Sequence, residues 1–266
     1  MTTVAKDYTL AELMIVQAAE AFRNDGEVLA TGIGVIPRLG ASLAMKTFNQ
    51  DLMMTDSEAY LLSEPNPIGR KPGEGQKAET WMGFTRIFDN VWSRKRHAMI
   101  GPTQIDKFGQ CNISTLGGTY EQPKIQMLGV RGLPGNSISH ANSLFVPSHN
   151  PKVFVSGECD LVNSIGYNPE RLPKGYELAD IDIRIILTDL CVLDFSGPNH
   201  EIALVSVHPG ITVEQVVENT GFELIIPEEV PTTAAPTEEQ LEIIRALDPQ
   251  NMRSKQLKDN PPGDRS

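Results

Sequence analysis

One glycine-rich segment has the residue types best suited to chemistry in this 266-residue chain. Gly129, Gly132 and Gly135 recur at every third position around a single cation, Arg131. Glycines this close together let the main chain adopt positive φ and bring bare N–H groups close to a ligand. Backbone amides beside a guanidinium can bind an anion or a developing oxyanion, and Asn136 adds a side-chain amide. The pattern predicts such an anion cradle, and the alternative is a glycine-rich surface turn.

Two carboxylates follow a short apolar run that begins at Leu52. Asp56 and Glu58 stand in the sequence Thr-Asp-Ser-Glu, where the predicted strand ends. In open α/β sheets, ligands bind beyond the carboxyl ends of the strands, and a carboxylate there can act as a nucleophile, a base or an acid. The alternative is that Glu58 is a solvent-facing residue at the start of a helix.

A second polar run follows the apolar residues 98–100. Its members Gln104, Asp106 and Asn112 either bind a ligand or tie two turns together. The five histidines show no metal-ligand spacing, so we expect no metal. His97 follows three basic residues and is expected at a solvated helix end, where cations complement the helix dipole.

The elements that would position these residues alternate between strands and helices. Thr9 and Glu12 form a capping-box pattern ahead of an amphipathic helix that ends before Asn24. Strand and helix patterns then alternate at residues 27–34, 37–48, 52–56, 84–94 and 98–101. This order predicts an α/β fold in which a mostly parallel sheet is covered by helices.

The second half of the chain adds further strand and helix patterns. Strands are predicted at residues 152–157, 183–188 and 201–207, and helices at residues 213–219 and 237–246. Apolar periodicity stops after Pro249. The sequence therefore predicts one domain over residues 1–250 and a disordered tail over residues 251–266.

Composition restricts the partners and the compartment. A formal net charge of −11 gives no footprint for nucleic acid. The start of the chain lacks a secretory pattern, and no apolar run is long enough to span a membrane, so we expect neither secretion nor membrane association. Cys111, Cys159 and Cys191 are an odd number in dissimilar contexts, which favours a reduced cytoplasmic compartment.

Five segments together resemble the β subunit of a family I CoA-transferase. They are Gly32-Ile-Gly-Val-Ile-Pro-Arg-Leu-Gly-Ala, Thr55-Asp-Ser-Glu-Ala, the run from Ile100 to Asn112, the run from Gly129 to Asn136, and Val216-Val-Glu-Asn-Thr-Gly-Phe. Within that family, His140 and the run Ser164-Ile-Gly-Tyr make the chain most similar to the steroid ring-cleaving hydrolases. The resemblance covers most of residues 9–250. It implies a CoA-transferase-type fold, a homologous α subunit in an αβ or α2β2 assembly, an acyl-CoA substrate and no further cofactor.

The resemblance also indicates a role for one glutamate. Family transferases attack the acyl-CoA thioester with a β-subunit glutamate, and Glu58 stands at the matching position. Tyr60 replaces the glycine that family members place after this glutamate, so covalent transfer of CoA is not expected. A second Ser-Glu pair ends at Glu64, but it falls late and its neighbouring prolines predict a loop, so Glu58 ranks first.

The function implied by the resemblance is hydrolysis of a ring carbon–carbon bond next to a ketone in a steroid-derived acyl-CoA. The principal base would come from the α subunit. Glu58 or Asp56 would give secondary acid or base help. CoA, a substrate carboxylate or an oxyanion would be bound by six residues: Gln104, Gly129, Arg131, Gly132, Gly135 and Asn136. Two alternatives remain, namely a CoA-transferase with Glu58 as nucleophile and a non-catalytic subunit that completes the pocket of its partner.

Overall fold

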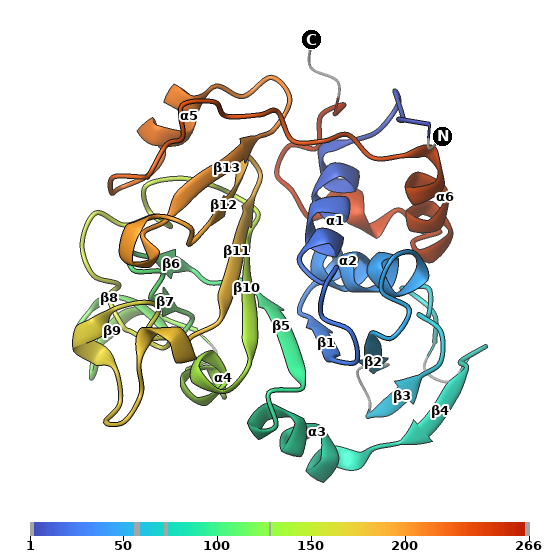
Figure 1. The fold of residues 1–266 in the computed structure, drawn as a ribbon, viewed down its shortest axis with the longest axis horizontal. Helices are drawn as coiled ribbons and strands as arrows, with labels where there is room; N and C mark the ends of the chain where they lie inside the picture. Colours follow the sequence, from blue (N-terminus) through green and yellow to red (C-terminus); the bar gives the residue numbers. More distant parts are fainter. Residues whose placement is uncertain (1–2, 56–58, 72–73, 128, 264–266) are drawn as a thin grey trace. The chain divides into compact units, whose positions relative to one another are not determined.

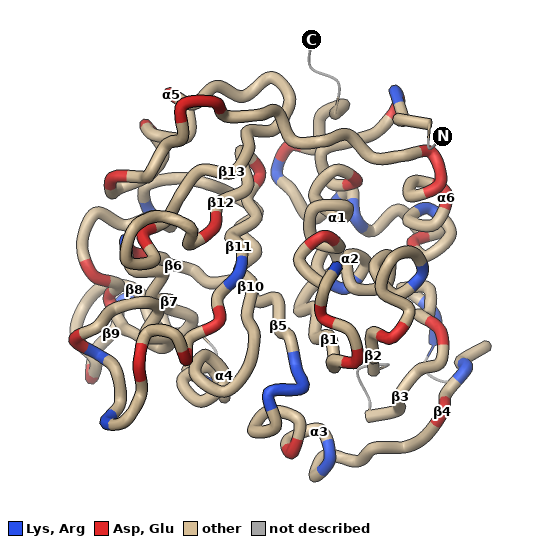
Figure 2. The backbone as a smooth tube through the Cα atoms, in the orientation of Figure 1, with Lys and Arg blue, Asp and Glu red and all other residues tan. Residues whose placement is uncertain are grey.

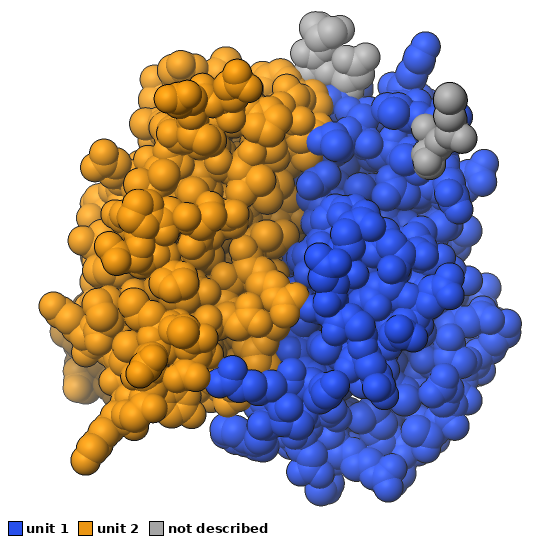
Figure 3. Space-filling view, viewed as in Figure 1, with its two compact units in different colours: residues 1–100, 234–266 blue, residues 101–233 orange. Residues whose placement is uncertain are grey.

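The computed structural model describes residues 3–55, 59–71, 74–127 and 129–263. The chain divides into two compact units, one formed by residues 1–100 with 234–266 and the other by residues 101–233 (Figure 3). The sequence predicted one domain up to residue 250, and nothing in its pattern indicated that the C-terminal part returns to the N-terminal unit. That return is fixed by main-chain pairing, because the amide of Ala5 donates to the carbonyl of Pro236 at 2.9 Å.

The first unit has one layer of strands and one layer of helices (Figure 1). The strands are β1 (Leu29–Gly32), β2 (Met53–Thr55), β3 (Tyr60–Leu62), β4 (Ala78–Trp81) and β5 (Arg96–Ile100), and the helices are α1 (Leu10–Glu20), α2 (Val35–Lys46), α3 (Gly83–Trp92) and α6 (Glu238–Leu247). β1 pairs in parallel with β2 and β5, whereas β3 and β4 are added in antiparallel fashion beyond β2. Helix α2 packs on β1, and α1 and α6 pack on α2.

Close packing of α1 on α2 explains the composition of these two helices. The capping box predicted for α1 is confirmed, since Thr9 Oγ1 accepts from the amide of Glu12 and the Glu12 carboxylate accepts from the amide of Thr9. Gly40 of α2 faces α1 so closely that a Cβ at this position would lie 2.6 Å from the Cβ of Ala18. A glycine here is therefore required by helix packing and not by a turn.

His97 corrects one expectation from the sequence. It lies inside β5 and its side chain is fully buried, so it is not at a solvated helix end. Its Nδ1 lies 2.7 Å from the carboxylate of Asp25, and its ring packs on Phe22. The preceding basic run hid a buried strand residue whose polar atom has an acidic partner.

The tail from residue 251 is also different from the expectation of disorder. Residues 252–255 form a short 3-10 helix, and the guanidinium of Arg253 binds Glu12 at 2.9 Å and Asp248 at 3.0 Å. Farther along, Asn260 Oδ1 accepts from the amide of Ala11 at 2.8 Å. The segment through residue 263 is thus held by buried ion pairs and hydrogen bonds, which leave no apolar periodicity in the sequence; residues 264–266 lie outside the described part of the chain.

The second unit is built on a four-stranded sheet. Its strands run in the order β10 (Ala141–Val146), β11 (Ile183–Thr188), β12 (Cys191–Asp194) and β13 (Ala203–Val207), with β10 and β11 parallel and the others antiparallel. Two small hairpins pair β6 (Gln104–Ile105) with β7 (Cys111–Asn112) and β8 (Thr115–Gly118) with β9 (Pro123–Gln126). The helices are α4 (Leu133–Ser139) and α5 (Val213–Glu218). The strand predicted at residues 152–157 is wrong, because Phe154 makes only an isolated bridge with Ile105.

The predicted α/β class is confirmed. Parallel pairs carry β1 in the first unit and join β10 to β11 in the second, and antiparallel strands extend both sheets. No helix among the described residues has the length and apolar character needed to cross a membrane.

Candidate functional site

The segment around Arg131 forms a turn followed by a helix, which differs from the predicted glycine cradle. Gly129 has φ 84° and Arg131 has φ 49°, so the main chain is left-handed at both positions. Gly132 has φ −89° and caps α4, and Gly135 and Asn136 lie within that helix. Only the first of the three glycines uses its conformational freedom. The segment turns helical because Pro134 in the first turn fixes a φ that suits a helix.

This geometry leaves Arg131 in a favourable place for an anion. The residue is exposed, and it directly precedes the first turn of α4, where amide groups lack partners within the helix. Gly132 serves the helix rather than a ligand, because its carbonyl accepts from the amide of Asn136 at 2.9 Å. The anion-binding part of the prediction therefore depends on the Arg131 side chain and not on three glycine amides.

The end of α4 is joined to β10 by two buried polar residues. His140 ends the helix, and its Nδ1 lies 2.8 Å from the carbonyl of Ala141, so Nδ1 is the protonated nitrogen of the neutral ring. Asn142 Nδ2 donates to the carbonyls of His140 at 2.7 Å and Asn136 at 3.2 Å. These bonds hold α4 on the first residues of β10. Asn142 Oδ1 is buried and has no hydrogen-bond partner among the described residues.

The polar run after β5 ties turns together. Gln104 is buried, and its Oε1 accepts from Asn112 Nδ2 at 2.8 Å and from the amide of Asp160 at 3.0 Å. The carboxylate of Asp106 accepts from Gln110 Nε2 at 2.6 Å and from two backbone amides of the same turn. Burial raises the pKa of Asp106, and these hydrogen bonds oppose the shift. Of the two alternatives for this run, the geometry favours the structural tie, which also places Gln104 away from the role of a ligand contact.

The two carboxylates predicted to carry acid or base chemistry, Asp56 and Glu58, lie outside the described residues. The structure gives their neighbours: β2 ends at Thr55, and Ala59 has φ 79°. Tyr60 opens β3, and its side chain is 42% exposed, so the aromatic ring that replaces the family glycine is at the surface.

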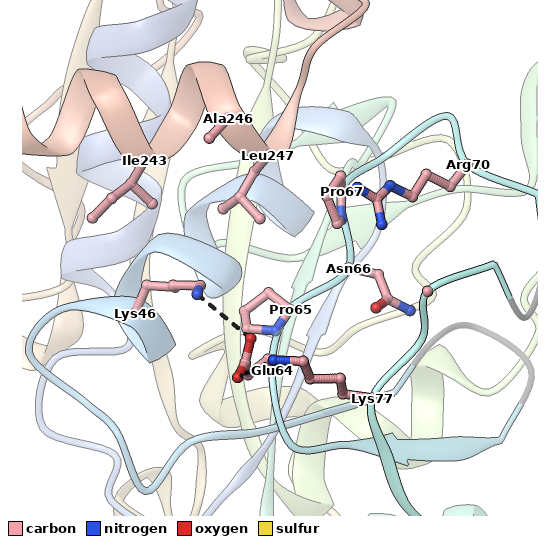
Figure 4. Close-up of a pocket in the computed structure, with 11 residues that line it drawn as sticks. Lys46, Glu64, Pro65, Asn66, Pro67, Arg70, Lys77, Ile243, Ala246 and Leu247 are labelled. Carbon is pink, nitrogen blue, oxygen red and sulfur yellow. Dashed lines mark hydrogen bonds and ion pairs between the residues drawn. The ribbon is translucent and has the colours of Figure 1, made fainter.

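Glu64, the second-ranked glutamate, lies at a surface pocket of about 340 Å³ (Figure 4). Lys77 Nζ is 2.8 Å from one of its carboxylate oxygens, and Lys46 Nζ is 3.9 Å from the other. The hydrogen bond from Lys77 lowers the pKa of Glu64. Pro65 and Pro67 also line the pocket, in the loop that the prolines predicted. A carboxylate held between two ammonium groups is a poor nucleophile, which argues against Glu64 as the attacking group.

Cysteine and histidine chemistry is absent from the exposed surface of the described chain. All three cysteines are free and buried, and burial raises the pKa of the Cys191 thiol to about 12. His149 is buried between Thr188 and Thr220, and burial lowers its pKa to about 3, so the ring is neutral at physiological pH. Within the described ranges, no three His, Cys, Asp or Glu side chains are grouped so as to hold a metal ion.

A group of exposed aromatic residues carries a signal that the sequence reasoning did not use. Trp81, Phe84, Phe88 and Trp92, which we call the aromatic ridge, lie on β4 and α3 with side chains more than 60% exposed. The helix was predicted, but the spacing of its aromatic residues at i, i+4 and i+8 was not interpreted.

Comparison with known proteins gives close relatives over the whole chain. No model of a protein family matches. The chain is 37% identical to the cholesterol ring-cleaving hydrolase IpdB subunit of Rhodococcus jostii, over 97% of this chain and 99% of that protein. It is 34% identical to the second, B-type chain of 3-oxoadipate CoA-transferase from Pseudomonas knackmussii, over 91% of this chain and 94% of that protein.

Solved structures agree with these sequence relatives. The crystal structure of Rhodococcus jostii IpdAB matches with a TM-score of 0.87 and 36% identity, over 95% of this chain and 99% of the matched chain. Glutaconate coenzyme A-transferase from Acidaminococcus fermentans matches with a TM-score of 0.77 and 24% identity, over 93% of this chain and 97% of the matched chain, and at this identity it supports the fold alone.

Proposed function

Because the chain belongs to the family of CoA-transferase-type β subunits that includes the IpdB subunit of the cholesterol ring-cleaving hydrolase, we propose that it is the β subunit of a heteromeric ring-cleaving hydrolase. The observation that carries this proposal is the 37% identity to that subunit over 97% of the chain. Its partner is a homologous α subunit, and its substrate is a steroid-derived acyl-CoA in which one ring carbon–carbon bond lies next to a ketone.

The reaction adds one water molecule across that bond. The water oxygen bonds to the ketone carbon, and the resulting oxyanion collapses with cleavage of the ring bond. The departing carbon keeps the bonding electron pair and takes up a proton, and the ketone carbon becomes a carboxylate. The principal base belongs to the α subunit, and Glu58 or Asp56 of this chain assists proton transfer.

Arg131 supplies positive charge to the anionic groups of the reaction. Its exposed guanidinium, held on a left-handed turn ahead of α4, can bind a carboxylate or phosphate with two parallel hydrogen bonds or stabilise the oxyanion. Asn136 and the main chain from Gly129 to Gly135 fix the direction of this turn. The only cofactor is the CoA of the substrate.

A CoA-transferase is the second candidate. The 34% identity to a chain of 3-oxoadipate CoA-transferase favours it, and Glu58 would then be the nucleophile. Tyr60 argues against it, because its ring stands where the family glycine gives the thioester room to approach the glutamate. A purely structural role is the third candidate, and it gives Arg131 no part in turnover.

The compartment proposed for the enzyme is the cytoplasm. Three free, buried cysteines fit a reducing environment, and an enzyme that uses acyl-CoA meets its substrate inside the cell.

Substitution of Arg131 tests the proposed site in the assembled complex with its α subunit. We expect Arg131→Ala to lower turnover by about 100- to 1,000-fold, as for loss of one oxyanion donor. Arg131→Lys should be impaired less, because a point charge keeps the attraction but not the bidentate geometry. Arg23→Ala removes another exposed arginine, paired with Glu20 at 2.6 Å, and is the matched control. Wild-type turnover in Arg131→Ala would reduce the segment to a structural turn.

A further inference from the structure

The aromatic ridge is an apolar surface that the chain itself does not cover. Side-chain exposure is 63% at Trp81, 73% at Phe84, 61% at Phe88 and 70% at Trp92. The three residues of α3 recur at every fourth position and therefore share one face of the helix. Within α3 only Gly83 and Val91 are buried. In the first unit, α3 lies at the end opposite to α1 and α6 (Figure 1).

The size of the ridge is that of an interface. Four aromatic side chains, each about two-thirds exposed, present on the order of 500 Å² of apolar surface. The largest apolar patch of a monomeric protein is about 300–600 Å², and it is often functional. A standard interface buries about 800 Å² on each partner, so the ridge alone would supply more than half of one.

The charges around the ridge describe the surface that fits it. Arg86 on α3 and the pair Arg94 and Lys95 after it are exposed, and Asp89 is the single acidic residue of the helix (Figure 2). This basic rim stands out on a chain of formal net charge −11. A complementary partner therefore has an apolar centre with acidic residues around it.

The ridge continues toward the candidate catalytic segment. Trp81 is the register partner of Tyr60 on β3, and the amide of Met82 donates to the carbonyl of Ala59 at 2.8 Å. Ala59 directly follows Glu58 in the sequence. A partner seated on the ridge would thus lie next to the chain segment that leads from the candidate glutamate.

From these observations we propose that the aromatic ridge is the docking surface for the α subunit. This proposal rests on the proposed function, which requires such a partner. The position of the ridge beside the segment that follows Glu58 favours the α subunit over a lipid surface or a second copy of this chain, because the α subunit supplies the principal base and must reach that segment.

Substitutions on α3 test the proposal with the co-expressed α subunit. Phe88→Ala should weaken association by about 30-fold or more, as for a central aromatic anchor. Phe88→Glu should abolish co-purification and at the same time make the isolated chain more soluble and monodisperse, because a charge replaces exposed apolar surface. This gain of solubility separates loss of docking from loss of folding. Tyr120→Glu places the same charge at a side chain that is 77% exposed on the second unit, and it should leave assembly unchanged.

Three outcomes would overturn the docking surface. They are wild-type association of Phe88→Glu with the α subunit, equal weakening by Tyr120→Glu, and binding of the wild-type chain to vesicles of phosphatidylglycerol and phosphatidylcholine that is lost in Phe88→Glu while assembly persists. Failure of the wild-type chain to bind any α subunit would instead contradict the proposed function.

Discussion

Helices α1 and α3 belong to the same unit and are both rich in apolar residues, but only α1 is covered. Leu13, Met14 and Ile15 of α1 are fully buried against α2 and α6, whereas Phe84 and Phe88 of α3 are among the most exposed apolar residues described. The chain thus supplies the partners of α1 itself. The difference teaches that α1 serves folding of this chain, and that α3 waits for a surface outside it.

The charges of the two helices follow the same division. Glu12 of α1 is buried, and its carboxylate binds Arg253 at 2.9 Å and Arg245 at 3.0 Å. On α3, Arg86 and Asp89 are exposed. Removing a charge should therefore affect stability through α1 and association through α3.

Breaking the ion cluster of α1 should have the largest effect on stability. Glu12→Gln keeps the shape of the side chain but leaves Arg253 partly uncompensated in a buried position, and we expect a loss of about 3–5 kcal/mol in the free energy of unfolding. Denaturant titration measures this loss.

Glu64→Gln is the matched control for that variant. Glu64 also lies between two cations, Lys46 and Lys77, but its side chain is 49% exposed, so we expect no measurable change in stability. Equal losses in Glu12→Gln and Glu64→Gln would remove the distinction between a buried and a surface cluster.

Truncation of apolar side chains compares the two helices directly. Leu13→Ala on α1 opens a cavity in a packed site and should cost about 2–5 kcal/mol. Phe88→Ala on α3 deletes a larger side chain, yet it should leave the unfolding free energy of the chain unchanged because no packing is lost. A loss of stability in Phe88→Ala as large as that in Leu13→Ala would show that α3 is part of the core.

Acid titration gives a smaller effect that belongs to neither helix. Burial lowers the pKa of His149 to about 3 from an ordinary value of 6.5, so the unfolded chain binds a proton below pH 6.5 that the folded chain does not. The stability from this group is complete above pH 6.5 and falls toward pH 3, by at most about 1.4 kcal/mol per pH unit. His149→Gln should flatten the curve between pH 6.5 and 5. The contribution of Glu12, whose pKa is lowered mainly by its arginine bonds against the effect of burial, should be lost only below about pH 4.5.

An unchanged slope in His149→Gln would assign the acid sensitivity to other groups. Variants of α1 and α3 offer an internal check, since neither helix contains a histidine, and both should keep the wild-type slope in this range.

Local signals in the sequence predicted what depends on local contacts. Thr9 with Glu12 and Thr237 with Gln240 predicted two helix starts, and both capping boxes are confirmed. The helix predicted at residues 84–94 is found at Gly83–Trp92. Periodicity identifies which residues share a face, but it does not say what covers the face, so the exposure of the aromatic ridge could not be predicted.

The incorrect predictions involve contacts that are distant in sequence. The tail after Asp248 is ordered because Arg253 reaches Glu12, a residue 241 positions earlier. In the glycine segment, a proline in the first turn of α4 prevailed over the expectation of an open loop. The roles of Asp56 and Glu58 stay predictions, and the side chain of Arg131 keeps the part of the site prediction that geometry supports.

The most direct test of the account follows the fate of the water oxygen. The assembled complex with its α subunit is incubated in ¹⁸O-labelled water with a steroid-derived ring ketone carried as its CoA thioester, and the products are examined by mass spectrometry. We predict a product that has gained one water molecule, with ¹⁸O in the new carboxylate, the CoA thioester intact, and no adduct on Glu58 after trapping with hydroxylamine. Transfer of CoA to an added free acid, with a trapped adduct on Glu58, would contradict the hydrolase and establish the transferase.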